Sequence, residues 1–250
     1  MIEKINKKWV LNKRPEGMPD DDCWKLEEVP IPEVKEGSIL IKTLYLSIDP
    51  YMRGRMNDAK SYADPIKIGE VMTGESVGVV VESKSDNFSV GDYVCAHRGW
   101  QSYIVAHGDD RQLFKADPKI VPLSTYLGTV GMPGRTAYFG LLRVGKPKSG
   151  ETIVVSAASG AVGTVVGQMA KILGCRAVGI AGGETKCSYV TDELGFDACV
   201  DYKAGNLEAD LKAACPDGID IYFENVGAEV SKAVANLSLI HISEPTRRTP

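Results

Sequence analysis

The chain has few residues that could bind a metal ion or cross-link its backbone. Only three histidines occur in 250 residues, and none of the cysteines forms a C-x-x-C pair; the six are Cys23, Cys95, Cys175, Cys187, Cys199 and Cys215. Structural zinc sites and disulfide frameworks use closely spaced cysteines and histidines. The sequence therefore predicts no metal centre and a reduced, cytoplasmic setting. We expect His97 and His107 to pack or to form surface hydrogen bonds rather than to catalyse.

The chain also lacks a long apolar run and a large net charge. The stretch 39–48 is apolar but is interrupted by polar residues and is too short to cross a bilayer. Glu3 and Lys4 break any apolar core in the first residues, so we expect no secretion signal there. A net charge of −4 gives no electrostatic case for nucleic acid. The hydrophobic content of 44% is enough for two domains with their own cores.

Residues 152–163, read as TIVVSAASGAVG, run from β-branched apolar residues through a turn of small residues into a helical pattern. Ala158, Gly160 and Gly163 fall in the register of G-x-G-x-x-G, with alanine at the first position. We expect a tight turn at Ala158, a close approach to a pyrophosphate at Gly160, and close packing of helix on strand at Gly163. The free amides at the helix start would face the phosphates. The segment therefore predicts a dinucleotide-binding turn.

A glycine turn between a strand and a helix could also serve only a steric need. The order of the elements after this turn favours a nucleotide-binding site instead. Apolar residues recur at helical spacing up to Leu173, and Gly174 then marks a helix end. Further strands are predicted at 176–181, 198–201 and 219–223, with a helical stretch at 185–194. Repeated βα order predicts a Rossmann-type, doubly wound parallel sheet.

The choice of cofactor depends on the end of the second predicted strand. NAD-binding units usually carry an acid there that holds the ribose hydroxyls. Here the chain reads Ala181-Gly182-Gly183, and Lys186 follows at the start of the next helix. A cation with free amides could hold a 2′-phosphate, which favours NADP. Lys186 could also be an ordinary surface lysine, and Glu184 leaves NAD as the alternative.

The N-terminal part has a different texture. Short predicted strands at 39–46, 76–81, 93–97 and 103–106 alternate with glycine, proline and acidic turns, which indicates a mainly β domain. Helical stretches at 126–130 and 135–142 then lead through KPKSG at 146–150 into the nucleotide-binding part. We place the first domain at 1–122 and the second at 123–236.

The last residues break this rhythm. The string LSLIHISEPTR at 237–247 resembles the translation of a transposase adapter used to prepare sequencing libraries. We therefore expect 237–250 to be non-native, His241 to have no functional meaning, and the nucleotide-binding sheet to be incomplete. A genuine basic C-terminus is the alternative.

Three separated motifs occur in order along the chain: SIDPYMRG at 47–54, GMPGRTAYFG at 131–140 and FENVG at 223–227. Together they resemble the zinc-independent medium-chain dehydrogenases/reductases, in the branch of prostaglandin reductases, leukotriene dehydrogenases and curcumin reductases. The resemblance implies an N-terminal GroES-like domain, a Rossmann domain, NADP(H), a cytoplasmic location and a homodimer. Zinc-dependent relatives carry Gly-His-Glu where this chain reads Thr73-Gly74-Glu75, so the resemblance implies no metal there.

The resemblance also implies roles for individual residues. The pyrophosphate would lie along Gly160, Ala161, Val162 and Gly163, the phosphorylated ribose would contact Lys186 and Tyr202, Asn225 would meet the cofactor, and Thr136 would lie near the nicotinamide. Tyr202 and Asn225 could instead be an ordinary strand-end tyrosine and turn asparagine.

The reaction implied is reduction of the carbon–carbon double bond of an α,β-unsaturated aldehyde or ketone. Hydride adds to the β-carbon, hydrogen bonds stabilise the enolate, and the α-carbon is protonated. Tyr51 is the candidate phenol that donates to the carbonyl or delivers the proton; its alternative is a turn tyrosine packed after Pro50. A quinone reductase, or a protein that binds NADPH without catalysis, are the competing hypotheses.

Overall fold

The computed structural model describes residues 5–61, 63–237 and 242–243. The chain forms two compact units, the first ending at Leu127 and the second beginning at Gly128. The predicted boundary after residue 122 lies ahead of this division. The short 3-10 helix η2 (Leu123–Leu127) belongs to unit 1 because Tyr126 and Leu127 pack against Val77 and Ala116 there.

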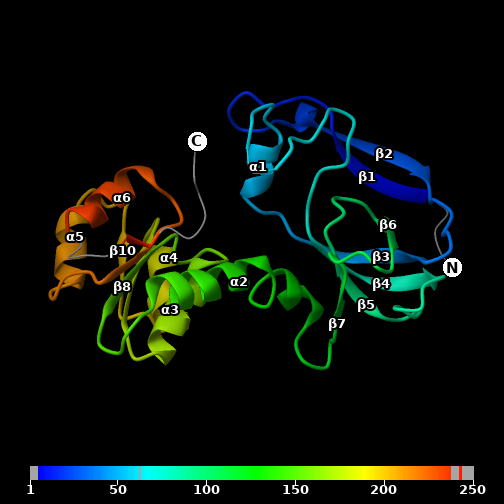
Figure 1. Ribbon diagram of the computed structural model, residues 1–250. Coiled ribbons are helices and arrows are strands. Elements are labelled where there is room, and N and C mark those ends of the chain that lie inside the picture. The colour runs from blue at the N-terminus through cyan, green and yellow to red at the C-terminus, as the bar shows by residue number, and fades with distance from the viewer. Residues whose placement is uncertain (1–4, 62, 238–241, 244–250) are drawn as a thin grey trace. The chain divides into compact units, whose positions relative to one another are not determined.

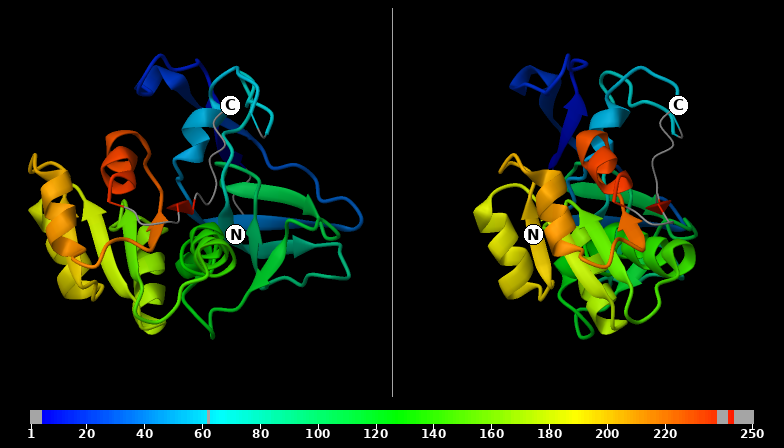
Figure 2. Two further views of the ribbon diagram at one scale, coloured as in Figure 1. Left: turned by 60° about the vertical axis from the view of Figure 1, so that its left-hand side comes forward. Right: turned by 90° about the vertical axis from the view of Figure 1, so that its left-hand side faces the viewer.

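Unit 1 is mainly β and contains two sheets, which Figure 2 shows as separate ribbons. The five-stranded antiparallel sheet has the order β6-β3-β4-β5-β7. Its strands are β3 (Ser38–Leu46), β4 (Ser76–Ser83), β5 (Tyr93–Ala96), β6 (Tyr103–His107) and β7 (Phe114–Ala116). The second sheet is the pair β1 (Ile5–Leu11) and β2 (Trp24–Pro30), with the 3-10 turn η1 (Asp21–Cys23) between them and the helix α1 (Tyr51–Arg55) after β3. The fold class predicted for this half is confirmed.

Unit 2 is built on a sheet of order β10-β9-β8-β11-β12, in which every neighbouring pair is parallel. The strands are β8 (Thr152–Ser156), β9 (Arg176–Ala181), β10 (Ala198–Asp201), β11 (Ile221–Phe223) and β12 (Ile242–Ser243). The chain runs outward from β8 to β9 and β10, and then returns to the other side of β8. This reversal confirms the Rossmann-type topology and places its switch point between β8 and β11.

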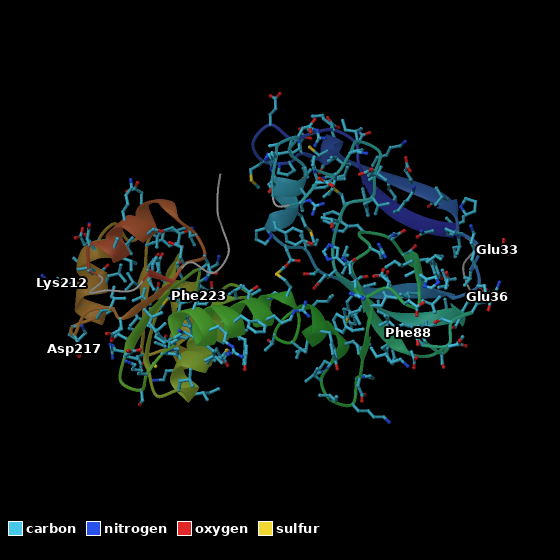
Figure 3. All side chains as sticks on the ribbon, in the orientation of Figure 1. Glu33, Glu36, Phe88, Lys212, Asp217 and Phe223 are labelled. Atoms are coloured by element: carbon cyan, nitrogen blue, oxygen red, sulfur yellow. The ribbon has the colours of Figure 1, made fainter. Side chains whose placement is uncertain are left out.

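Helices cover both faces of this sheet (Figure 1). One face packs against α2 (Met132–Phe139), its π-helical continuation η3 (Gly140–Gly145) and α3 (Gly163–Ile172), through side chains such as Leu141 and Val166. The opposite face packs against α5 (Leu207–Ala214) and α6 (Ala228–Ala235), through Leu211 and Val234. Figure 3 shows Phe223, a fully buried residue of β11, in the interior of this unit. Burial on both faces explains why the strands are continuous apolar runs.

Several helical bounds differ from the prediction. The stretch predicted at 126–130 is instead η2, and the following helix begins earlier than residue 135, because Pro133 fits the first turn of α2. The stretch predicted at 185–194 divides into α4 (Glu184–Ser188) and the π-helical η4 (Tyr189–Glu193). Of the predicted non-native tail, 238–241 and 244–250 lie outside the described residues, and its origin stays a prediction.

Candidate functional site

The turn after β8 brings the chain from the centre of the parallel sheet into α3. The backbone of Ala157 adopts a positive φ of 47°, and the amide of Ala158 donates to the carbonyl of Ile180 in β9 at 3.0 Å. The left-handed residue is therefore Ala157, one position before the tight turn that we predicted at Ala158. The reversal begins as soon as β8 ends, since Ala158 is already tied to the neighbouring strand.

Gly163 packs where no side chain fits. A Cβ atom at Gly163 would lie 2.3 Å from the Ala157 carbonyl oxygen and 2.8 Å from the Ala158 Cα. A Cβ atom added at Gly160 would lie 3.0 Å from the Ala157 carbonyl oxygen. The close contact at Gly163 is made with the turn just after β8 rather than with the strand itself. The first amides of a helix precede its hydrogen-bonded ladder, so those around Ala161 and Val162 are suited to an anion.

Alanine at the first position of the turn is accommodated by the neighbouring strand. Ala158 is fully buried, and a Cβ atom added to Gly179 in β9 would lie 2.8 Å from the Ala158 Cβ. The methyl group of Ala158 thus occupies space that a side chain at Gly179 would need. Alanine at position 158 fits into the turn because Gly179 in β9 has no side chain.

The ends of β9 and β10 bring Tyr202 against Gly182. A Cβ atom at Gly182 would lie 2.8 Å from the Tyr202 hydroxyl oxygen and from its ring, so the ring lies against a bare backbone. Tyr202 is 46% exposed and offers its other face to solvent. Lys186 is exposed in α4, which begins directly after Gly183. Both residues that we assigned to the phosphorylated ribose therefore follow the carboxyl ends of neighbouring strands.

Asp201, at the end of β10, was not identified from the sequence. Its Oδ1 accepts the amide of Gly183 at 2.8 Å and the amide of Lys203 at 2.9 Å. These two backbone donors lower the pKa of the Asp201 carboxyl below its ordinary value. An acid does stand near this strand end, but its carboxylate holds the two turns together. Because Asp201 Oδ1 already accepts two backbone amides, this carboxylate is a poor substitute for the ribose-binding acid of an NAD site.

Asn225 follows β11, on the other side of β8. Its backbone amide donates to Ser156 Oγ at 2.7 Å, and its side-chain Nδ2 donates to the Ser156 carbonyl at 2.9 Å. Ser156 is the last residue of β8 and is fully buried. Asn225 is thus held at the carboxyl ends of β8 and β11, which is the switch point of the sheet. Its Oδ1 is the atom that it can present to a ligand.

Glu224 organises the loop that carries Asn225. Its Oε1 accepts Ser156 Oγ at 2.8 Å and the Gly227 amide at 2.9 Å, and its Oε2 accepts the Tyr222 hydroxyl at 2.6 Å and the Ser231 hydroxyl. Burial alone would raise the pKa of Glu224, but the hydrogen bonds from Ser231, Tyr222 and the backbone lower it to about 2. Burial and Glu224 together raise the pKa of Tyr222. Tyr222, Gly227 and Ser231 are near Glu224 in the sequence, whereas Ser156 is 68 residues away. The sequence placed Glu224 in the FENVG motif but did not show its contact with Ser156.

Thr136 lies in α2, where its hydroxyl donates to the Met132 carbonyl one turn earlier at 2.9 Å. The side chain is half-buried. Its assignment near the nicotinamide stays a prediction.

Tyr51 opens α1 in unit 1 and lies near His97. The two rings are tilted by 33° with centroids 6.4 Å apart, and His97 Nε2 lies 3.0 Å from the Thr73 hydroxyl. The guanidinium of Arg53 anchors the same helix by donating to the Gly17 carbonyl at 2.7 Å. Tyr51 is therefore set on a braced helix, half-buried beside a histidine for which we predicted packing or a surface hydrogen bond.

The position that carries a histidine in zinc-dependent relatives is closed here. A Cβ atom at Gly74 would lie 3.0 Å from the Trp100 ring and 3.1 Å from the Met52 methyl group. Within the described ranges, no group of three or more histidines, cysteines or acids is placed to hold a metal. A side chain at residue 74 would need Trp100 and Met52 to move slightly aside.

The described part of the chain contains no helix that is long and apolar enough to cross a membrane.

Known proteins share this architecture and much of the sequence. Residues 7–115 match the family model described as the N-terminal domain of oxidoreductase, and residues 161–239 match the one described as zinc-binding dehydrogenase. An NADPH-dependent curcumin reductase of Escherichia coli (strain K12) is 50% identical over 232 residues, covering 93% of this chain and 67% of that protein. The chain belongs to the medium-chain dehydrogenases/reductases. Within that family it lies in the branch of curcumin and prostaglandin reductases, as the three motifs indicated.

Two further family members support this placement. Prostaglandin reductase 1 of Oryctolagus cuniculus is 47% identical over 230 residues, covering 91% of this chain and 64% of that protein. A crystal structure of CurA from Vibrio vulnificus in complex with NADPH is 48% identical, has a TM-score of 0.88, and is matched over 93% of this chain and 68% of that one. The chain spans about two thirds of the length of these relatives.

Proposed function

We propose that this protein catalyses the NADPH-dependent reduction of the carbon–carbon double bond of α,β-unsaturated aldehydes and ketones. The single observation that supports this most strongly is the built switch point, where Ser156, Glu224 and Asn225 lock the ends of β8 and β11 together in a chain half identical to a curcumin reductase. The CurA–NADPH complex has the same fold and 48% sequence identity over this region.

The residues present fit an NADP molecule. Gly160 leaves the backbone of the turn without a side chain, and Gly163 lets α3 begin directly against the turn. Lys186 offers a cation for the 2′-phosphate, and the Tyr202 ring offers a surface for the adenosine side. Asn225 offers an acceptor on the opposite side of β8. When bound, NADPH supplies a hydride. The protein would orient the cofactor along the sheet edge and exclude water from it.

We propose Tyr51 as the proton donor to the substrate. A phenol on a braced helix can donate a hydrogen bond to the carbonyl oxygen as the enolate forms, or deliver the proton to the α-carbon. The closed position at Gly74 supports a reaction in which hydrogen bonds rather than a zinc ion stabilise the enolate.

We propose the following roles for the two domains and the following setting for the full protein. The first unit, with η2 included, would form the substrate and catalytic domain, and the second unit up to residue 236 would form the NADP domain. The full protein would act in the cytoplasm as a homodimer on a small-molecule carbonyl substrate, with no nucleic acid or membrane partner.

The test follows NADPH absorbance with a panel of 2-alkenals, enones and quinones, and identifies the product. Loss of absorbance with an enone and formation of the saturated ketone would support the proposal. Oxidation only with quinones, giving hydroquinone, would replace it with a quinone reductase. NADPH binding without turnover of any substrate would favour a non-catalytic binding protein.

A further inference from the structure

The carboxylate of Glu224 joins the end of β8 to β11 and α6, which follow it much later in the sequence. Ser156 donates to it from the end of β8, Tyr222 and the Gly227 amide donate from β11 and the loop after it, and Ser231 donates from α6. An ionised carboxylate only accepts hydrogen bonds, and each of these partners has a hydrogen to donate. The site therefore suits a charged carboxylate at this position.

Ser156 transmits this arrangement to Asn225. The Ser156 hydroxyl donates to Glu224 at 2.8 Å and accepts the backbone amide of Asn225 at 2.7 Å. By accepting the hydroxyl hydrogen, Glu224 turns a lone pair of Ser156 Oγ toward the Asn225 amide. The alternative acceptor for the same hydroxyl, the Phe223 carbonyl, lies farther away at 3.4 Å. Without Glu224 the hydroxyl would turn to that carbonyl, and the hold on the Asn225 backbone would loosen.

We propose that Glu224 is a positioning residue for cofactor binding, which acts through Ser156 to fix Asn225 at the switch point and does not itself touch the cofactor. This role rests on the proposed NADPH function. The proposal adds Glu224 to the glycine turn and to the residues near the phosphorylated ribose, because Glu224 supports Asn225 on the β11 side of the sheet.

The sheet order provides a way to separate positioning from general damage. Tyr202 follows β10 and Asn225 follows β11, on opposite sides of β8. Adenosine 2′,5′-bisphosphate carries only the half of the cofactor assigned to Lys186 and Tyr202. Loss of Glu224 should therefore weaken NADPH binding and leave binding of this fragment unchanged.

The experiment measures the Kd of NADPH and of adenosine 2′,5′-bisphosphate for the full chain and for Glu224→Gln, Asn225→Ala and the double variant. Loss of a neutral hydrogen bond costs about two- to tenfold in affinity, and we expect each single variant to show such a rise in the NADPH Kd. Because the two residues act as a unit, the double variant should be no more than about twofold weaker than either single variant. Glu229→Gln is the matched control, since Glu229 is exposed on α6 and pairs with Lys232.

Three outcomes would overturn the positioning role: an unchanged NADPH Kd for Glu224→Gln, additive effects in the double variant, or an equal loss of fragment binding. Should Glu224→Gln fail to fold, Ser231→Ala and Tyr222→Phe each remove one donor, and an NADPH Kd unchanged in both would overturn it as well. Failure of the unsubstituted chain to bind NADPH would overturn the proposed function itself, whereas binding with additive effects would overturn only the positioning role.

Discussion

A charged group persists in a partly buried loop only where its oxygen atoms are fully engaged, and Glu224 meets this condition. Hydrogen bonds to an ionised group contribute about 1.5–3 kcal/mol each, more than those between neutral groups. Ser156, Tyr222 and Ser231 supply such bonds to Glu224 from three elements. At the scale of single residues, the site is therefore held by charge-assisted contacts rather than by packing alone.

The pH dependence of stability should reveal this residue. The pKa of Glu224 is lowered from its ordinary value of 4.5 to about 2 in the folded protein, so the folded state binds that proton less readily than the unfolded state. Its contribution, up to about 3 kcal/mol, is full above about pH 4.5 and is lost as the pH falls toward 2. Among the described residues, Tyr222 is the titratable group that contacts it. Urea unfolding of wild type and Glu224→Gln should give a difference that shrinks below about pH 4.5; a difference independent of pH would contradict this.

Lys186 should set the preference between the two nicotinamide cofactors. Replacing it with alanine removes a charge-assisted contact to the 2′-phosphate, which we expect to weaken NADPH about ten- to a hundredfold while NADH is little affected. Lys212→Ala is the control, because Lys212 is exposed on α5 at the outer side of unit 2 (Figure 3). Equal losses for NADPH and NADH in titrations of Lys186→Ala would remove this residue from the phosphate site.

Tyr51 should affect chemistry rather than cofactor binding. Tyr51→Phe keeps the ring beside His97 but removes the hydroxyl, and general acid catalysis contributes about 10²–10⁴-fold. We expect kcat for an enone to fall by roughly that range while the Kd of NADPH stays nearly constant. Stopped-flow and steady-state assays measure the two quantities separately. Unchanged turnover would exclude Tyr51 from the mechanism.

At the scale of elements, α3 begins at Gly163 directly against the turn that follows β8. Glycine is required because the carbonyl of Ala157 occupies the place of a side chain there. The strand, the turn and the helix start thus form one unit, in which the amides suited to the phosphates are fixed by the same approach that excludes a Cβ atom.

Gly163→Ala should therefore destabilise the protein. Relief of the 2.3 Å contact requires the backbone to shift, and overpacking of this kind costs about 1–3 kcal/mol. Gly54→Ala is the control, since Gly54 lies in the helix α1 with open space around its Cβ position. Its expected effect is a small stabilisation of about 0.5–1 kcal/mol. Thermal unfolding compares the two; equal effects would show that the contact is not rigid.

Sequence patterns predicted some elements well and others not at all. β9 and β10 were predicted with the bounds that the structure shows, because buried parallel strands are short runs of apolar residues between glycine turns. β1 and β2 were missed, since lysines and glutamates pair across them and disguise the strands as polar segments. The glycine turn was likewise visible in sequence. Glu224 stands in the FENVG motif, but its role was not visible because it depends on Ser156 and Ser231 arriving from other elements.

At the scale of the whole molecule, three stretches that are far apart in the sequence meet at the carboxyl edge of one sheet. The turn after β8, the ends of β9 and β10, and the loop after β11 would together contact one extended ligand. The topology makes this meeting unavoidable, because all strands of unit 2 are parallel and their carboxyl ends share an edge.

Hydrogen exchange should show the three stretches responding together. NADPH at about 100 times its Kd raises the free energy of unfolding of the protein by about 2.7 kcal/mol. We expect slower amide exchange at 157–163, 182–186 and 225–227 when NADPH is added, and no change in the β1–β2 pair. Protection restricted to a single stretch would argue against one ligand spanning the edge; adenosine 2′,5′-bisphosphate, as a control, should protect 182–186 but not 225–227.

The pairing of Ala158 with Gly179 couples substitutions at these two positions. One methyl group fits between the turn and β9, and Val190 Cγ1 and Cys199 Sγ, at 2.9 and 3.1 Å from the added Cβ, bound the rest of that space. An alanine at 179 would crowd all three neighbours, and loss of the methyl at 158 would relieve only the nearest of them. The effect of a substitution at 179 therefore depends on which residue stands at 158.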